Sequence, residues 1–492
     1  MLVGVAFAAA ELLFVSPRMG LSWDESVYVS QVSGHAPAAW FDPARARGIT
    51  LLVAPVAALT GSVAGLRVYL SVASGLGLVL ALWAWRPLRP AWVLGLAGLA
   101  FGGLWVTQFY GPQAMPDMWS AVGCLAAVGC FLRWVQARGH GQTGRDGARG
   151  RWALAGLGAS IAFVTLVRPG DAVYLSVPLL VSIIAVTAWR CWPPAAAIAA
   201  GLLAGGAEWV AEAYARFGGI TARLHAAGAE QGGFGLHFAL PDELRALNGP
   251  TLCRPCVIGI RDPELDLWWL ALPLLVALGV LAARWAGHAR SGGSAGDPGA
   301  SVRPPAGGSR GSYPRAGMSS ALLAAACGLC LAAQYLFMIN YAAPRFLLPA
   351  YALFAIPVAD ALAFLVTGVS WQLRPAMAAT VTCFLVLQLF TQHIVLDHEV
   401  GGTVTFHDDY TRIAASLSRL GVSPPCLVNG VQYIPIAFYL GCASAGNAAD
   451  AAPGEHVALL IQSGRRPPSY ARSWPSYRIT GTTVLRVNAY VR

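Results

Sequence analysis

Eleven long apolar runs, separated by arginines, prolines and polar loops, constrain this 492-residue chain more than any other feature of its sequence. The hydrocarbon core of a bilayer is about 30 Å thick, so a helix needs roughly 20 mainly apolar residues to cross it. Only 11% of the residues are charged and 56% are hydrophobic, which excludes an ordinary soluble domain. The sequence therefore predicts a polytopic α-helical membrane protein with about 11 transmembrane helices. These helices are expected at residues 2–16, 64–85, 91–111, 115–135, 152–167, 172–189, 194–211, 267–284, 319–340, 346–367 and 376–395.

The arginines are distributed unevenly between the two sides of the predicted bundle. With a cytoplasmic N-terminus, the inner loops are denser in arginine than the outer loops, as the positive-inside rule requires. The loops at residues 17–63 and 212–266 and the tail after residue 396 then lie on the extracytoplasmic side. The net charge of +10 therefore reflects membrane topology, and it does not indicate a nucleic-acid partner.

Two stretches of the membrane region differ from the rest. The first apolar run is short, contains Glu11 and has no basic residue before it, so it matches a signal peptide poorly and we expect a retained helix. Residues 286–317 are rich in Gly, Ser and Pro, and they predict a disordered cytoplasmic linker. Residues 1–396 are thus expected to form one transmembrane module.

The tail at residues 397–492 has a different pattern. The runs "PCLVNGV", "HVALLIQS" and "TTVLRVNAYVR" are β-like and "DYTRIAASLSRL" is helical, so we predict a small extracytoplasmic α/β domain. Cys426 and Cys442 flank one strand-turn unit and are expected to form a disulfide in an oxidising compartment, with two separate buried thiols as the alternative. Cys253 and Cys256 form an isolated CxxC in an outer loop, which favours a local disulfide over a four-cysteine zinc site.

Two adjacent carboxylates follow the first apolar run, in the stretch "GLSWDESVYVSQ". Ser22 and Glu25 have the spacing of a helix capping box, which by itself explains Glu25. The capping box does not explain Asp24. On the helix that follows, Asp24 and Tyr28 are four residues apart and share a face, so we expect both to point toward a membrane-embedded cavity.

A second acid, Asp117 in "FYGPQAMPDMWS", lies at the outer mouth of the fourth predicted helix. Burying an ionisable side chain there is costly unless a partner pairs with it. Outer-face arginines supply such partners, although for each arginine alone a snorkelling membrane anchor is the alternative. Glu208 and Glu212, near the outer end of the seventh helix, are candidates for lining the cavity, with a solvated helix end as the alternative. The candidate arginines are Arg45 and Arg47 in "FDPARARGI", Arg168 in "LVRPGD" and Arg345 in "NYAAPRFLLPAY".

Carboxylates and arginines gathered at the outer membrane surface fit one kind of chemistry well. In sugar transfer from a polyprenyl-phosphate donor, the acceptor hydroxyl must lose a proton, and a carboxylate serves as general base. The leaving group is a lipid-tethered phosphate, whose developing charge guanidinium groups bind and stabilise. A divalent cation such as Mg²⁺ or Mn²⁺ is able to assist or replace the arginines.

Several stretches of the chain resemble the GT-C superfamily of integral membrane glycosyltransferases. The likeness is to the branch that contains protein O-mannosyltransferases, the lipid A aminoarabinose transferase and related actinobacterial enzymes. It covers most of the first 395 residues, and "WDESVY" is its most specific part. The other matching stretches are "RVYLSVASGLGLVLALWAW", "MPDMWSAVGCLAAVGCFLRW", "GASIAFVTLVRPGD" and "PRFLLPAYALFAIPVADAL".

The resemblance implies a multi-pass enzyme of the cell membrane with an extracytoplasmic cavity, a polyprenyl-phosphate-linked sugar donor and an inverting displacement. The acidic motif of the family falls on Asp24, as base or metal partner, and on Glu25 as its support. Its second acid falls on Asp117, so a divalent cation would be bound by Asp24 and Asp117.

The resemblance assigns the phosphate of the donor to arginines in this chain, which has no lysine. Arg168 and Arg345 are expected to bind it, assisted by Arg45 or Arg47. Mannose and arabinofuranose both fit as the sugar, and a protein, a wall glycan, a glycolipid or a small metabolite fits as the acceptor. The alanine-rich, arginine-only composition is typical of a high-GC bacterium, for which decaprenyl phosphate is the expected carrier.

Two other classes of function remain open at this point. A transporter or flippase for a lipid-linked sugar also uses intramembrane charges, but repeated halves with broken helices in matching positions are typical of it, and no such duplication is visible. A catalytically silent scaffold with a sugar-binding ectodomain would not need acids at the mouths of the first and fourth helices.

Overall fold

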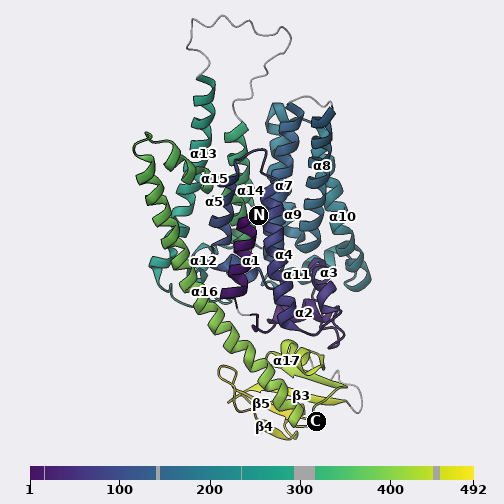
Figure 1. Ribbon diagram of the computed structural model, residues 1–492. Helices are drawn as coiled ribbons and strands as arrows, with labels where there is room; N and C mark the ends of the chain where they lie inside the picture. The colour runs from purple at the N-terminus through teal and green to yellow at the C-terminus, as the bar shows by residue number, and fades with distance from the viewer. Residues whose placement is uncertain (16, 140–143, 234, 293–315, 447–454) are drawn as a thin grey trace, which may run out of the picture.

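The protein is described here by a computed structural model that covers residues 1–15, 17–139, 144–233, 235–292, 316–446 and 455–492. A bundle of long helices lies beside a small sheet, and one helix runs from the bundle into the sheet (Figure 1). Each of the eleven predicted apolar runs overlaps a helix of the bundle. These helices are α1 (Leu2–Phe14), α4 (Val63–Trp83), α5 (Ala91–Gly102), α6 (Trp105–Tyr110), α7 (Pro116–Gly139), α8 (Gly144–Val167), α9 (Pro169–Ala185), α10 (Trp192–Arg216), α13 (Leu267–Gly292), α14 (Ala316–Met338), α15 (Leu348–Thr367) and α16 (Arg374–Arg419).

Eight helices in the described part of the chain are long and apolar enough to cross a membrane, namely α4, α7, α8, α10, α13, α14, α15 and α16. The predicted count of eleven is not confirmed. The three other runs correspond to α1, α5 and α9, which have 13, 12 and 17 residues. The run at residues 91–111 is divided because α5 ends at the glycine pair Gly102 and Gly103, and glycine is a poor helix former.

The helices α7 and α15 form the centre of the bundle. In the membrane-spanning part of α7, 83% of the residues are buried, and in α15 72%, compared with 22% in α10 and α13. Small residues allow close packing around α7, since Gly129 lies against Trp85 and Gly123 lies against Val164 of α8. The helix that begins with Pro116 and Asp117 is therefore held on all sides by protein.

Short helices cover the end of the bundle that lies nearest the sheet (Figure 1). The capping box predicted at Ser22 is confirmed, because its side chain accepts from the N–H of Glu25 and its own N–H donates to the Glu25 carboxylate. This pair fixes the start of the helix that carries Asp24. Both predicted outer loops are thus partly helical, with α2 (Trp23–Ser30), α3 (Gly48–Ala57), α11 (Ile220–Glu230), α12 (Leu240–Ala246) and the 3₁₀ turn η2 (Pro263–Asp266).

The predicted boundary between residues 396 and 397 falls inside α16, which is continuous over 46 residues. The apolar run and the helical run "DYTRIAASLSRL" are one helix, which continues through Gly401 and Gly402 and contains no proline after its first turn. Asp409 on this helix is buried and accepts bonds of 2.7 and 2.8 Å from the N–H groups of Val484 and Leu485, which fastens the sheet region to α16.

The residues after α16 form a five-stranded sheet with the strand order β2-β1-β3-β5-β4. The three strands expected from the sequence are present as β1 (Cys426–Gly430), β3 (His456–Gln462) and β5 (Val487–Val491). β1 pairs in parallel with β2 and β3, whereas β5 is antiparallel to β3 and β4. A disulfide joins Cys426 to Cys442. The remaining elements are α17 (Tyr433–Leu440), β2 (Ala443–Ser444), β4 (Ser476–Arg478) and two 3₁₀ turns, η1 (Thr187–Trp189) and η5 (Ser469–Ala471).

The predicted linker at residues 286–317 needs correction at both ends. The helix α13 continues to Gly292 and α14 begins at Ala316, so the flanks of the linker are helical. Alanine and arginine in "AARWAGHAR" favour helix, which explains the extension. Residues 293–315 of the prediction lie outside the described residues.

Candidate active site

Most of the predicted site residues converge at the end of the bundle where α2 lies. Asp24 is in the first turn of α2, and Asp117 is in the first turn of α7. Arg168 immediately precedes α9, and Arg345 lies in the 3₁₀ turn η3 (Pro344–Leu347) before α15. Four segments far apart in sequence therefore bring two acids and two arginines together.

Asp24 lies between two arginines. Nη2 of Arg45 donates to its Oδ1 at 2.7 Å, and Nη2 of Arg345 lies 3.4 Å from its Oδ2. Burial alone would raise the pKa of Asp24, but the charges of Arg45 and Arg345 outweigh it and hold this pKa below its ordinary value. The side chain of Asp24 is still 30% exposed. Asp24 is thus an ionised carboxylate that a substrate can reach.

Asp117 has the same kind of partners but no such access. Nη1 of Arg168 donates to Oδ1 of Asp117, and Nε of Arg345 lies 3.6 Å from its Oδ2. Only 1% of this side chain is exposed. Because this buried carboxylate contacts both guanidinium groups, Asp117 orients Arg168 and Arg345.

Arg168 has three further neighbours that the sequence prediction missed. Its guanidinium lies over the rings of Phe346 and Tyr335, with 4.9 and 5.1 Å to the centroids. Its Nε lies 3.9 Å from Asp171, which accepts from the hydroxyls of Ser120 and Tyr335. The sequence does place Asp171 three residues after Arg168, in "VRPGD". A carboxylate in the first turn of a helix is common, however, so this position alone does not indicate a functional residue.

Glu25 lies on the other side of α2 and is fully buried. It pairs with Arg67 of α4, which the prediction missed because a single arginine inside an apolar run carries no local signal. Oε1 of Glu25 also accepts from the N–H of Ala114 at 2.8 Å. Burial alone would raise the pKa of Glu25, but the charge and hydrogen bonds of Arg67, together with the N–H groups of Ser22 and Ala114, lower it. All these partners lie inside the protein, so they fix Glu25 and with it the first turn of α2.

Arg47 belongs to a second cluster, apart from its near neighbour Arg45. It donates to Glu212 at 2.6 Å and lies 3.4 Å from Glu208, the two acids predicted to line the cavity. Glu212 also accepts from Arg223 at 3.0 Å and from Arg216 at 2.8 Å. The structure therefore groups Arg47 with Glu208 and Glu212, and Arg45 with Asp24.

Tyr28 shares a face of α2 with Asp24, as the spacing predicts. The guanidinium of Arg45 lies 5.1 Å from its ring centroid. Burial raises the pKa of Tyr28 to about 12, so its hydroxyl stays protonated at neutral pH. Tyr28 and Asp24 together hold Arg45 from two sides.

The predicted metal site does not fit the arrangement of these residues. Asp24 and Asp117, its two expected ligands, both contact the guanidinium of Arg345, which takes the place of a bridging cation. Within the described ranges, no group of three or more His, Cys, Asp or Glu side chains is placed to hold a metal ion. Mg²⁺ requires oxygen ligands, and arginines already contact the carboxylate oxygens of Asp24 and Asp117.

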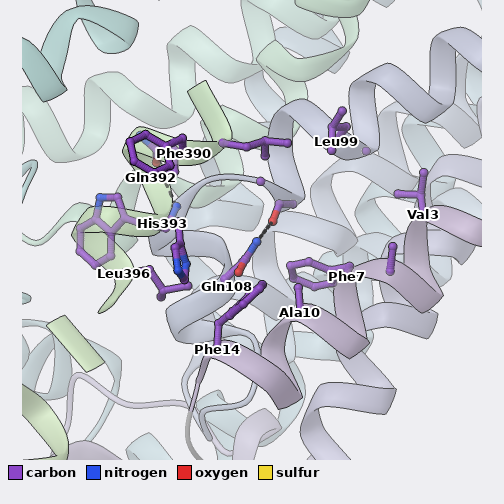
Figure 2. Close-up of a pocket in the computed structure, with 16 residues that line it drawn as sticks. Val3, Phe7, Ala10, Phe14, Leu99, Gln108, Phe390, Gln392, His393 and Leu396 are labelled. Carbon is purple, nitrogen blue, oxygen red and sulfur yellow. Dashed lines mark hydrogen bonds between the residues drawn. The ribbon is translucent and has the colours of Figure 1, made fainter. Parts of the chain in front are cut away.

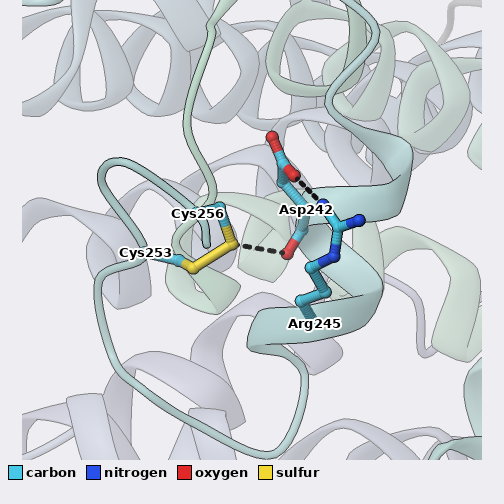
Figure 3. Close-up of a disulfide and its surroundings, with 4 residues drawn as sticks. All are labelled: Asp242, Arg245, Cys253 and Cys256. Atoms are coloured by element: carbon cyan, nitrogen blue, oxygen red, sulfur yellow. Dashed lines mark hydrogen bonds and ion pairs between the residues drawn. A yellow bond between two sulfur atoms is a disulfide. The ribbon is translucent and has the colours of Figure 1, made fainter. Parts of the chain in front are cut away.

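A disulfide-closed loop lies beside Arg345. Nη1 of Arg345 donates to the carbonyl oxygen of Thr251 at 3.3 Å. A disulfide joins Cys253 to Cys256, and Figure 3 shows it next to the ion pair of Asp242 and Arg245 on α12. The loop therefore forms one edge of the site.

An apolar pocket of about 410 Å³ lies between α1, α5, α6 and α16 (Figure 2). Phe7, Phe14 and Phe390 line it, together with Gln108 and other mainly apolar residues. None of the predicted acids or arginines is in its lining. The helix α6 connects pocket and site, because Tyr110 at its end accepts from Arg345 at 3.4 Å.

Comparison with known proteins identifies the fold. No protein-family model and no curated protein matches the chain. Among solved structures, ArnT from Cupriavidus metallidurans bound to undecaprenyl phosphate matches with a TM-score of 0.62 and 13% identity, over 100% of this chain and 97% of that one. The oligosaccharyltransferase AglB from Archaeoglobus fulgidus, in complex with an inhibitory peptide and a dolichol-phosphate, matches with a TM-score of 0.50 and 11% identity, over 93% and 69%. The chain therefore shares the fold of these two proteins.

At these identities the likeness concerns the fold alone. In this fold, the acid-bearing helix α2 follows α1, and the candidate arginines Arg168 and Arg345 both lie at turns between helices of the bundle. The bundle thus supplies the frame that brings Asp24, Asp117 and their arginines together.

Proposed function

We propose that this protein is a glycosyltransferase that moves a sugar from a polyprenyl-phosphate donor to an acceptor hydroxyl at the extracytoplasmic membrane surface. The observation that carries the proposal is Asp24, an accessible carboxylate held between Arg45 and Arg345 at the mouth of a GT-C bundle. The structure of ArnT with undecaprenyl phosphate supports a lipid-phosphate ligand for this fold.

The donor phosphate is proposed to bind Arg345 and Arg45, with Arg168 beside them. In the structure, the carboxylate of Asp24 pairs with both of the first two arginines. A phosphate is a stronger partner for a guanidinium fork than a single carboxylate, since it offers more acceptor oxygens. Donor binding therefore draws Arg45 and Arg345 away from Asp24.

This exchange of partners prepares Asp24 to act as the base. The two arginine charges lower its pKa, and a bound phosphate compensates those charges, so the pKa of Asp24 rises when the donor binds. A carboxylate with a higher pKa is a better proton acceptor at neutral pH. The base thus gains strength only when the donor is present.

The transfer step is a direct displacement at the anomeric carbon of the sugar. The acceptor oxygen attacks the anomeric carbon of the sugar from the face opposite the phosphate, and its proton passes to Asp24. The bond between the anomeric carbon and the phosphate oxygen breaks, and polyprenyl phosphate leaves with the bonding electron pair. The arginines stabilise the charge that develops on this leaving phosphate, and the configuration at the anomeric carbon is inverted.

The other predicted residues position these groups. Asp117 holds Arg168 and Arg345, and Glu25 holds the start of α2 through Arg67. The apolar pocket between α1, α5, α6 and α16 is a suitable place for part of the hydrocarbon chain of the donor, because it is apolar and α6, which lines it, ends at Tyr110 beside Arg345.

The finer identity of the substrates is proposed from the sequence resemblance. Mannose or arabinofuranose is the proposed sugar and decaprenyl phosphate the proposed carrier. The proposed acceptor is a glycan, glycolipid or protein outside the cytoplasm. These choices rest on the stretches "WDESVY" and "PRFLLPAY" and on the arginine-only composition.

The proposal is tested with the protein in nanodiscs and radiolabelled polyprenyl-phosphate-mannose or polyprenyl-phosphate-arabinofuranose, each offered with a panel of glycan, glycolipid and peptide acceptors. We expect label to leave one of the two lipids with wild type. With Asp24→Asn the label should stay on the lipid. Asp408→Asn is the matched control for this variant, since Asp408 pairs only with the surface residue Arg412 in the ion pairs described. Movement of intact lipid-linked sugar across sealed vesicles, without loss of label from the lipid, would replace transfer with transport.

A further inference from the structure

Large apolar side chains are exposed in the loops on either side of α12, outside the helices that can span the membrane. Leu236 is 88% exposed, Val257 84% and Phe238 64%, and Leu252 and Ile260 are also exposed. Single exposed apolar residues are ordinary, but a group of five in two adjacent loops calls for a partner surface.

Both loops are tied to the same helix end. The N–H groups of His237 and Ala239 donate to carbonyl oxygens at the end of α14, each at 2.9 Å. Cys253 and Ala342 exchange backbone bonds of 2.9 and 3.3 Å, four residues beyond the end of α14. These bonds hold the backbone next to Leu236, Phe238 and Leu252, so these three side chains cannot turn inward without breaking them.

Both loops lie next to the ends of helices that can span the membrane. The ring of Phe238 packs on Phe337, in the last turn of the candidate span Ser320–Met338, with centroids 6.1 Å apart. The second loop leads directly into another candidate span, Pro263–Arg284. In Figure 1, α12 accordingly lies beside the lower end of α13. Both loops are thus within a few residues of chain that enters or leaves a bilayer.

We propose that residues 235–239 and 252–260 insert into the interfacial layer of the lipid bilayer. Transfer of a large apolar side chain from water into an apolar phase is favourable, so burying these five side chains in the bilayer stabilises the loops at the membrane. The exposed charges in and next to the second loop are balanced, with Arg254 and Arg261 opposing Asp262 and Glu264. The attraction is therefore apolar and does not require anionic lipid.

This inserted surface has a role that rests on the proposed function. Thr251, directly before the apolar residues, accepts from Arg345, the central arginine of the site. The disulfide between Cys253 and Cys256 closes the turn that presents Val257. The loop thus forms the lipid-side edge of the site, past which a lipid-linked donor reaches Arg345.

Photo-crosslinking tests the insertion independently of any enzyme activity. A benzophenone amino acid replaces Val257 or Leu236 in full-length protein in nanodiscs of radiolabelled, zwitterionic phosphatidylcholine. Tyr477 is the matched control, because it is 42% exposed on β4 of the sheet, away from the helix ends. We expect at least five-fold more lipid label at positions 257 and 236 than at 477. Equal labelling at all three positions would overturn the proposal.

The role at the edge of the site is tested with Val257→Asp, and with Val257→Ser if the aspartate variant does not fold. We expect the KM for the lipid-linked donor to rise at least three-fold at unchanged kcat. An unchanged KM would remove the role in donor access. If no donor is consumed even by wild type, the proposed function fails, while the crosslinking result still decides the insertion.

Discussion

Arg345 bridges Asp24 and Asp117, with its Nη2 3.4 Å from Oδ2 of Asp24 and its Nε 3.6 Å from Oδ2 of Asp117. One of these carboxylates is accessible and the other is buried. The guanidinium is thereby fixed on its buried side and can exchange partners on its open side. This asymmetry lets a substrate phosphate displace Asp24 while Asp117 keeps Arg345 in place.

The first prediction concerns Arg345 itself. Arg345→Lys keeps the charge but loses the planar fork that spans two partners, so we expect donor binding to weaken by about 10- to 100-fold, the equivalent of a lost charged hydrogen bond. Donor affinity is measured by titration of the labelled lipid into nanodiscs. Arg412→Lys, at an exposed ion pair, is the control. An affinity equal to wild type would show that phosphate binds elsewhere.

The second prediction concerns the buried pair of Glu25 and Arg67, with side chains 0% and 1% exposed. Replacing one member, as in Glu25→Gln or Arg67→Met, leaves the other uncompensated, which costs about 3–5 kcal/mol of folding free energy. The double variant should lose less than the sum of the two single variants. Reversible denaturation in detergent measures these values. Strict additivity would argue that the pair is not coupled.

The third prediction concerns a clamp between the sheet region and the start of α2. The hydroxyl of Tyr439 accepts from the N–H of Leu21 at 2.7 Å, and Nδ1 of His407 lies 2.8 Å from the carbonyl oxygen of Gly20. Tyr439→Phe removes one of these bonds, so we expect kcat to fall about 3- to 10-fold, the cost of one hydrogen bond, at unchanged donor affinity.

Tyr433→Phe is the matched control for this clamp. It makes the same chemical change in the same helix, α17, and keeps the ring contact with Trp23 at 5.1 Å. Its kcat should equal that of wild type. Equal losses in the two variants would point to a general loosening of α17 in place of a specific hold on α2.

The fourth prediction concerns pH. Burial would raise the pKa of Asp24, but the charges of the arginines around it lower this pKa. In the free enzyme, Asp24 therefore stays ionised at pH values below its ordinary pKa of about 3.9. The acid limb of kcat/KM should then lie below that pH, whereas the limb of kcat lies higher because bound phosphate compensates the arginines. Arg45→Gln should move the kcat/KM limb to higher pH. Identical limbs for kcat and kcat/KM would contradict the exchange of partners.

Local patterns in the sequence predicted the parts of this site that depend on neighbouring residues. Ser22 and Glu25 form the expected capping box, and Asp24 and Tyr28 share a face as their spacing requires. Asp24, Arg345 and Asp117 were also placed together correctly, because each lies at the same end of a predicted membrane helix. In these cases helix geometry and membrane topology were sufficient.

Other parts depend on contacts between distant segments and had no local signal. Arg67 pairs with Glu25 from inside an apolar run, and its role appears only when α4 is packed against α2. Arg47 and Arg45 are two residues apart, yet their side chains join different clusters. Hydropathy likewise ended the last membrane helix near residue 395, whereas α16 continues through polar sequence to Arg419 because the sheet packs on it.

The role of Asp24 as base is tested most directly by single-turnover transfer in nanodiscs, comparing Asp24→Asn with wild type at saturating donor. A general base contributes about 10²–10⁴-fold, so we expect a loss of this size in the rate of transfer. Donor binding should be equal or tighter, because Arg45 and Arg345 no longer pair with a carboxylate. A transfer rate equal to wild type, with donor bound, would contradict the assignment of Asp24.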